Sequence, residues 1–157
     1  MTAPGLAARR AAAALLAGVL DRSETLADQA GASGPLAALA PAERARAQTL
    51  AAGTLRHLGR IDVFLGRYLQ KPPPSAAMNA LRLAAAEVHL DGIPAHAAVD
   101  GAVRLVRGAK GGDRLAGLVN AVARRAAADT AGWEAARKSP PFPATRAATG
   151  GCRTPLS

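Results

Sequence analysis

The feature that most constrains the fold of this chain is its wealth of alanine combined with a near absence of aromatic residues. Half of the residues are hydrophobic, yet the chain has only one Trp, one Tyr and two Phe. Alanine has the highest helix propensity, whereas the β-branched and aromatic residues that strands favour are scarce here. Such a core must be built from Leu, Val and close Ala contacts. The sequence therefore predicts an all-α fold.

Apolar residues recur at helical spacing in several segments that are separated by short breaks. The first helix is expected over 5–20, and 23–29 reads as an extension or a further turn of helix. Pro41 is placed to open another helix, because proline is favoured at the first helical position. Gly59 is expected to bend the chain before the next helix begins.

Three consecutive prolines at 72–74 form the clearest internal boundary, because they cannot continue a helix. We expect two helical subdomains to meet there, with Ser75 as the N-cap of the following helix. The apolar residues of the last helix should face inward. They are Leu115, Leu118, Val119 and Val122.

The 157 residues fit a single domain, because one core typically serves roughly 100–200 residues. We place this domain at 5–130 and expect six or seven helices in two packed subdomains. Beyond it, 131–157 loses the helical periodicity and gathers prolines. We expect this segment to be an irregular or disordered tail.

The chain is strongly basic, with a formal net charge of +9 from 20 Lys and Arg residues against 11 Asp and Glu residues. The excess is not confined to the tail, because 16 of the cations and 10 of the acids lie before residue 130. Most cations are Arg, whose planar fork of donors suits phosphate and favours nucleic-acid binding. A GC-rich genome also produces Arg-rich and Ala-rich chains, so the charge leaves both interpretations open.

The single cysteine, Cys152, cannot form an internal disulfide, which indicates a reducing compartment and a cytoplasmic protein. Arg9 and Arg10 before the apolar run 11–20 also resemble the start of a secretory signal. The charged residues that follow this run, and the helical spacing of its leucines, favour a helix instead. No segment approaches the roughly 20 apolar residues of a membrane span.

The sequence offers little support for catalysis or metal binding. His57, His89 and His96 are too far apart to form a local metal-ligand pair, and no cysteine accompanies them. The glycine-rich segment 108–112 lacks the Lys and the Ser or Thr that a phosphate loop places after its last glycine. We expect no metal, no cofactor and no catalytic residue, and we expect His89 to be a partly buried packing residue.

Basic residues near helix ends are the candidates for RNA contacts. They are Arg9, Arg10, Lys110, Arg114, Arg124 and Arg125. The first two lie near a helix N-terminus, where the helix dipole disfavours cations, so a ligand explains them better. The last two end a helix, where they either bind a ligand or complement the dipole. Lys110 lies within the glycine-rich segment and Arg114 follows it, so both are placed to touch phosphate near a helix start.

Five motifs, in this order along the chain, resemble the helices of the NusB family. They are Ala-Arg-Arg-Ala at 8–11, Thr-Leu-Arg at 54–56, Leu-Arg-Leu-Ala-Ala-Ala-Glu at 81–87, Ile-Pro-Ala-His-Ala-Ala-Val-Asp at 93–100 and Asn-Ala-Val-Ala-Arg-Arg at 120–125. The family comprises the transcription antitermination factor NusB, which pairs with a ribosomal protein to bind RNA, and the N-terminal domain of ribosomal small-subunit RNA cytosine-5 methyltransferases. The last two motifs look more like the methyltransferase branch.

The resemblance implies RNA contacts at Arg9 and Arg10, an approach of RNA to 114–118, and a packing or local hydrogen-bonding role for Asn120. It implies a non-catalytic domain that binds ribosomal RNA and helps to position the methyltransferase. A complete enzyme of that type uses S-adenosylmethionine and would continue into a cofactor-binding domain with two functional cysteines, which these 157 residues do not contain. Two alternatives remain: a stand-alone antitermination factor acting with a ribosomal protein, and a protein-interaction domain that binds no RNA.

Overall fold

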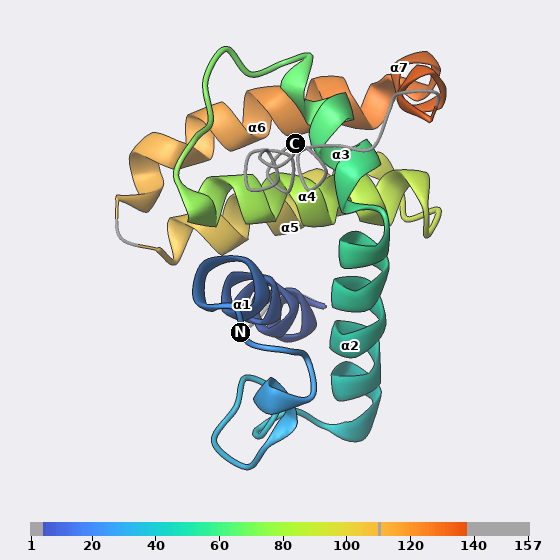
Figure 1. Cartoon of the computed structure of the whole chain (residues 1–157). Helices are drawn as coiled ribbons and strands as arrows, with labels where there is room; N and C mark the ends of the chain where they lie inside the picture. Colours follow the sequence, from blue (N-terminus) through green and yellow to red (C-terminus); the bar gives the residue numbers. More distant parts are fainter. Residues whose placement is uncertain (1–4, 110, 138–157) are drawn as a thin grey trace, which may run out of the picture.

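The computed structural model describes residues 5–109 and 111–137, and in these ranges it contains seven α-helices, one short 3-10 helix and no strand (Figure 1). The predicted all-α fold and helix number are confirmed. The elements in chain order are α1 (Leu6–Arg22), η1 (Asp28–Ala30), α2 (Pro41–Arg56), α3 (Leu58–Gly66), α4 (Ser75–His89), α5 (Ala95–Arg107), α6 (Gly112–Ala128) and α7 (Thr130–Ala136).

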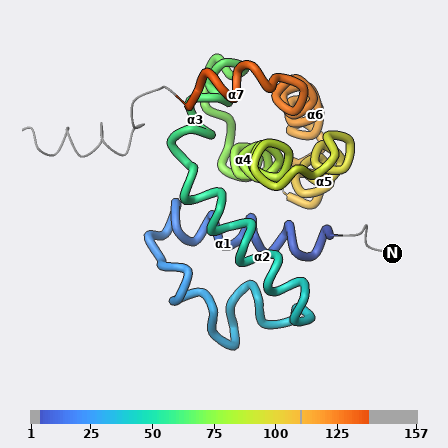
Figure 2. The backbone as a smooth tube through the Cα atoms, turned by 90° about the vertical axis from the view of Figure 1, so that its right-hand side faces the viewer, coloured from blue at the N-terminus to red at the C-terminus, as the bar shows by residue number. Residues whose placement is uncertain are grey.

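The helices form two packed groups (Figure 2). The lower group holds α1 and α2, and the upper group holds α4, α5 and α6, with α3 and α7 packed together beside them. Both helices of the lower group also contact α4. The chain passes from one group to the other between α2 and α3, so the boundary falls before the prolines at 72–74 and not at them.

Two helix boundaries differ from the expected ones. The bend between α2 and α3 lies at His57, two residues before Gly59. Ser75 is the first residue of α4 and makes no capping hydrogen bond. Its hydroxyl instead donates to the carboxylate of Asp21, 3.2 Å away, near the end of α1. This side chain therefore links α4 to the lower group.

Residues 23–29 do not extend the first helix. Ser23 adopts a left-handed backbone conformation, with φ of 58°, and ends α1. The Thr25 N–H donates to the Asp28 carboxylate, and the Asp28 N–H donates to the Thr25 hydroxyl oxygen, both at 2.9 Å. These reciprocal bonds satisfy backbone donors locally. They support only the single 3-10 turn at Asp28–Ala30.

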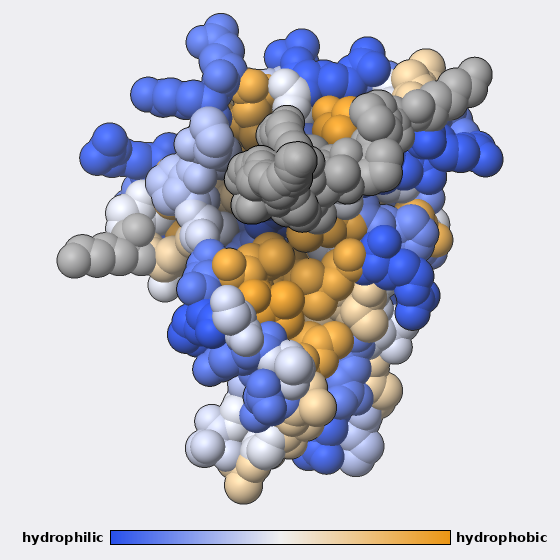
Figure 3. All heavy atoms as spheres, in the orientation of Figure 1, coloured by the Kyte–Doolittle hydropathy of each residue, from blue (hydrophilic) through white to orange (hydrophobic). Residues whose placement is uncertain are grey.

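Small side chains let the helices approach closely. Ala12, Ala47 and Ala51 are fully buried at contacts between helices. Leu118, which was expected to face inward, is 38% exposed, because α6 turns its neighbour Val119 to the core. On the face shown in Figure 3, apolar residues gather near the centre and hydrophilic residues lie around them.

A buried carboxylate joins three helices. Glu87 of α4 is 1% exposed, and its Oε1 accepts the Nε–H of Arg9 of α1 at 2.9 Å. Its other oxygen, Oε2, accepts from Nη2 of Arg46 of α2 at 2.7 Å. Gly101 of α5 leaves room for this arrangement, because a Cβ there would lie 2.6 Å from the Arg9 Nε. A buried charge needs such partners, since an unpaired one is strongly destabilising.

A seventh helix, α7, occupies the start of the segment 131–157 that was expected to be irregular. The Asp129 carboxylate accepts the Gly132 N–H at 2.8 Å and so satisfies one of the donors that a helix N-terminus leaves free. The prediction is therefore wrong for the residues of α7, and the folded domain includes this helix. The rest of the predicted tail, 138–157, lies outside the described residues.

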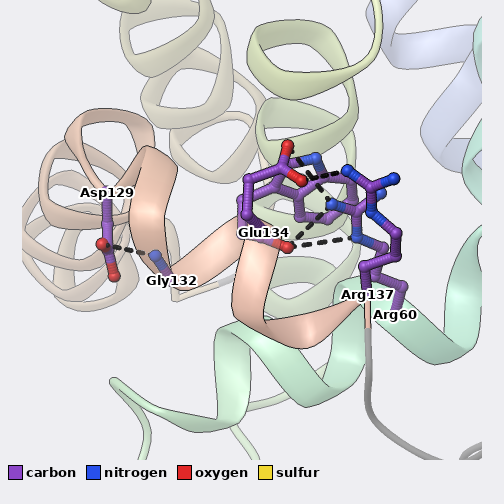
Figure 4. A network of polar contacts seen from close by, with 6 residues as sticks. Arg60, Asp129, Gly132, Glu134 and Arg137 are labelled. Carbon is purple, nitrogen blue, oxygen red and sulfur yellow. Dashed lines mark hydrogen bonds and ion pairs between the residues drawn. The ribbon is translucent and has the colours of Figure 1, made fainter.

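Trp133 anchors α7 to the core. It is 3% exposed, its indole stacks on the His89 imidazole with ring centroids 5.1 Å apart, and Phe64 meets it edge-on at 5.5 Å. The Arg60 guanidinium lies 3.7 Å from an indole ring centroid and donates to the Trp133 carbonyl, next to Glu134 (Figure 4). His89 is thus a partly buried packing residue, as predicted.

Replacing Glu87 with Ala is expected to lower the free energy of unfolding by about 3–5 kcal/mol, because the buried Arg9 guanidinium would lose this partner. Glu134→Ala is the matched control. It removes an exposed carboxylate that pairs with Arg60 and Arg137, and exposed pairs contribute little, so stability should hardly change. Urea unfolding followed by circular dichroism measures both variants. Similar small effects would show that the buried pair does not constrain the fold.

Candidate nucleic-acid interface

A groove of about 660 Å³ lies between α5 and α6. The two helices are consecutive in the chain, and the short turn that joins them contains Gly111 in a left-handed conformation, with φ of 74°. On the α6 side, Ala116 and Gly117 line the groove, and their small size leaves space between the helices. Val99 and Val103 of α5 add apolar lining. We call this feature the α5–α6 groove.

Polar groups line the same groove. Asn120 and Arg124 lie on one stripe of α6, and Arg107 lies in the last turn of α5. Because the helices run in opposite directions from their turn, Arg107 lies at the turn end and Arg124 toward the other end. Neither guanidinium makes a hydrogen bond or an ion pair with any residue in 5–109 or 111–137. The one carboxylate in the lining, Asp100, is bound by Arg104 at 2.8 Å.

Two further arginines extend this positive charge around the turn. The Arg10 Nη2 of α1 lies 3.6 Å from the point that a Cβ on Gly108 would occupy. Arg114 lines a shallow hollow of about 380 Å³ at the turn, together with Arg107. Both side chains are exposed and have no polar partner among the described residues. We define the arginine surface as Arg10, Arg107, Arg114 and Arg124.

The structure separates the two arginine pairs that the sequence places side by side. Arg9 is 7% exposed and bound to Glu87, so it is not accessible to RNA. The predicted RNA contact at Arg9 is therefore wrong. Adjacent positions on a helix point about 100° apart, which leaves Arg10 at the surface. Arg125 lies over the Tyr68 ring, 5.2 Å from its centroid, and outside the α5–α6 groove. Lys110 lies outside the described residues.

The burial of Arg9 also changes the electrostatic argument made for it. A cation near the N-terminus of a helix indicates a ligand, because the helix dipole disfavours a positive charge there. For Arg9 that ligand is the carboxylate of the protein's own Glu87. The argument from the dipole therefore supports Arg10 alone as a contact to another molecule.

Arg107 was not among the predicted contacts, and of the two roles expected for Asn120 the structure shows no local hydrogen bond. Arg107 ends α5, where a cation ordinarily complements the helix dipole, so nothing local distinguishes it. Asn120 was expected to pack or to bond locally, but its side chain makes no hydrogen bond with the part of the chain that the structure describes. Only the stripe of α6 residues spaced three and four apart, facing α5, would have indicated that Asn120 and Arg124 share a groove.

The described residues form neither a metal site nor a membrane-spanning helix. His57, His89 and His96 stay apart, and no group of three or more His, Cys, Asp or Glu side chains is arranged there to hold a metal ion. None of the helices over 5–109 and 111–137 has the length and apolar character needed to cross a bilayer.

The fold and the arginine surface together define a class of protein: a small all-α domain whose exposed arginines have no polar partner among the described residues and lie beside a partly apolar groove, as in binders of polyanions. The chain matches the NusB family over residues 6–128 and belongs to it. The predicted family is thereby confirmed.

The chain is also similar to two known proteins. It is 38% identical over 141 residues to the ribosomal RNA small subunit methyltransferase B of Xanthomonas campestris pv. campestris, a match that covers 83% of this chain and 32% of that protein. The chain thus spans about a third of the length of this relative. The structure of T. maritima NusB is similar in fold, with a TM-score of 0.65 and 23% identity, over 81% of this chain and 92% of that chain.

Tyr68 is expected to titrate at high pH. Burial, followed by the hydrogen bond that its hydroxyl donates to Asp129, raises the pKa of Tyr68 to about 12. Because this value lies above that of an unfolded tyrosine, about 10, the contribution to stability is complete below pH 10 and is lost as the pH rises through 12.

An ultraviolet titration of tyrosinate measures this pKa directly, since the chain has one Tyr. The Tyr68→Phe variant is the control, because it removes the signal. It should also abolish the loss of stability between pH 10 and 12. A midpoint near 10 in the folded protein would show that the contact with Asp129 does not form in solution.

Proposed function

We propose that this protein is a non-catalytic RNA-binding domain that helps to position a ribosomal RNA cytosine-5 methyltransferase on its target in the cytoplasm. The observation that carries the proposal is the arginine surface: four exposed guanidinium groups from α1, α5 and α6 that have no polar partner among the described residues. Guanidinium forks match the geometry of phosphate oxygens and can bind them through two hydrogen bonds. Lys110, which lies outside the described residues, is retained as a proposed contact.

The identity to methyltransferase B supports the link to a methyltransferase, because 38% identity extends over most of this chain. In this proposal the chain supplies RNA contacts, and the chemistry belongs to the part of such a protein that it does not span. That part would bind S-adenosylmethionine. The groove fits this division, because its lining includes His96 and Asp100 but no Ser, Thr, Cys or Lys side chain that could act as a nucleophile.

A second candidate is a NusB-type antitermination factor that binds a leader RNA together with a ribosomal protein. The observation that favours it is the fold match to T. maritima NusB, which covers 92% of that chain. Competition distinguishes the two candidates. Preference for small-subunit ribosomal RNA fragments supports the methyltransferase role, whereas a preference for leader RNA that requires a ribosomal protein supports antitermination.

RNA affinity should fall steeply as salt rises, because bound arginines displace counterions from phosphates. Arg107→Ala and Arg124→Ala should each reduce the slope of log affinity against log salt by about one unit or less. Fluorescence anisotropy with labelled ribosomal RNA fragments measures the slope.

Arg56→Ala is the matched control, because Arg56 is also exposed and without a polar partner in the described residues, but it ends α2 and lies outside the groove. Its slope should equal that of the unmodified protein. Equal slopes for all three variants would remove the arginine surface from the RNA site. Absence of RNA binding would favour a domain that interacts only with proteins.

A further inference from the structure

Arg9 and Arg10 are consecutive residues of α1, yet they make contacts of opposite kinds. Arg9 is buried and bound to the Glu87 carboxylate. Arg10 is exposed and has no polar partner among the described residues. The two side chains leave neighbouring points of one helix, so the contact that fixes Arg9 also restricts where Arg10 can lie.

Both arginines extend from α1 to one face of α5. A Cβ on Gly101 would lie 2.6 Å from the Arg9 Nε, and a Cβ on Gly108 would lie 3.6 Å from the Arg10 Nη2. Gly101 and Gly108 are seven residues apart, which is nearly two full turns, so they lie on the same side of the helix and about 10 Å apart along its axis. At both points where an arginine of α1 reaches it, α5 therefore has no side chain.

The two contacts differ in how tightly they hold. The Nε, Cδ and Cζ atoms of Arg9 all lie within 2.8 Å of the point that a Gly101 Cβ would occupy, so any side chain at position 101 must displace Arg9. Arg10 is only at ordinary van der Waals distance from the corresponding point at Gly108. Nothing at Gly108 fixes Arg10 in place, and its position follows from the anchored Arg9 beside it.

We propose that Glu87 is a positioning residue for RNA binding: by holding Arg9 over Gly101, it fixes α1 against α5 and so places Arg10 to bind a phosphate beside the α5–α6 turn. This inference rests on the RNA-binding function proposed above and gives buried residues a part in it. Arg46, the other partner of Glu87, comes from α2. Because α2 carries no residue of the arginine surface, Arg46 has no such part.

Two substitutions release Arg9 in different ways. Glu87→Gln removes the charge that attracts its guanidinium, whereas Gly101→Ala displaces it without changing any charge and also raises helix propensity. Each has a matched control. Arg46→Ala removes the other guanidinium bound to Glu87 and leaves the Arg9 bond in place. Gly53→Ala adds the same methyl group within α2, where a Cβ would meet no atom within 4 Å. Circular dichroism checks that each variant is folded.

The first measurement needs no RNA. The amide resonance of Gly108 in a nitrogen–proton correlation spectrum reports on the guanidinium beside it. Arg10→Ala should shift this resonance in the unmodified protein and in both control variants. When Gly101→Ala or Glu87→Gln is already present, Arg10→Ala should leave the resonance where it is, because Arg10 no longer lies beside Gly108.

The second measurement is the salt dependence of binding to labelled ribosomal RNA fragments. Arg10→Ala should reduce the slope of log affinity against log salt by about one unit or less. Gly101→Ala and Glu87→Gln should each reduce the slope by the same amount, and adding Arg10→Ala to either should change it no further. Arg46→Ala should lower stability and leave the slope unchanged.

The outcomes separate this inference from the proposed function. If Arg10→Ala lowers the slope equally with and without Gly101→Ala, RNA binding stands and the positioning role is wrong. It is also wrong if Arg46→Ala lowers the slope as much as Glu87→Gln does, because loss of stability would then explain both. If no RNA binds, the proposed function fails and the part of Glu87 in RNA binding fails with it, while the Gly108 resonance still shows whether Glu87 positions Arg10.

Discussion

The arrangement of the two helix groups depends on one buried carboxylate. Glu87 lies on α4 and binds guanidinium groups from α1 and α2, so a single side chain ties both helices of the lower group to the helix on which they pack. Removing either helix from this position would leave a buried charge without one of its partners, which is far more costly than losing an exposed pair. The same contact holds the start of α1 against α5 at Gly101, and it thereby places Arg10 beside the α5–α6 turn.

The property that builds the fold also builds the candidate site. Alanine and glycine let neighbouring helices approach closely in the core, and on the α5–α6 face Ala116 and Gly117 leave an open groove. The arginines fall into a structural group and an exposed group, and the amino-acid composition does not show which arginine belongs to which. Some hold the structure together, as Arg9 and Arg60 do, whereas those of the arginine surface have no polar partner among the described residues.

The sequence predicted the helices better than it predicted the site, and the reason is physical. A helix depends mainly on its own stretch of sequence, so prolines, glycines and the spacing of apolar residues indicate where it begins and ends. The exception is α7, which is too short to show a clear helical pattern. It is held by Trp133, whose partners His89 and Phe64 come from distant segments. The candidate site depends on such distant contacts throughout. Arg9 and Arg10 look equivalent until Glu87 is placed beside the first of them.

The separation of 78 residues between Arg9 and Glu87 bears on the order in which the protein assembles during synthesis. Chains emerge from the ribosome N-terminus first, so α1 and α2 are complete before any of α4 has appeared. In that interval the face of α1 that later packs on α4 carries a guanidinium with no α4 carboxylate to neutralise it. The surface of α1 that is later buried against α4 therefore carries an unneutralised positive charge at this stage. Its docking, and not the formation of its helices, is the step that has to wait for the middle of the chain.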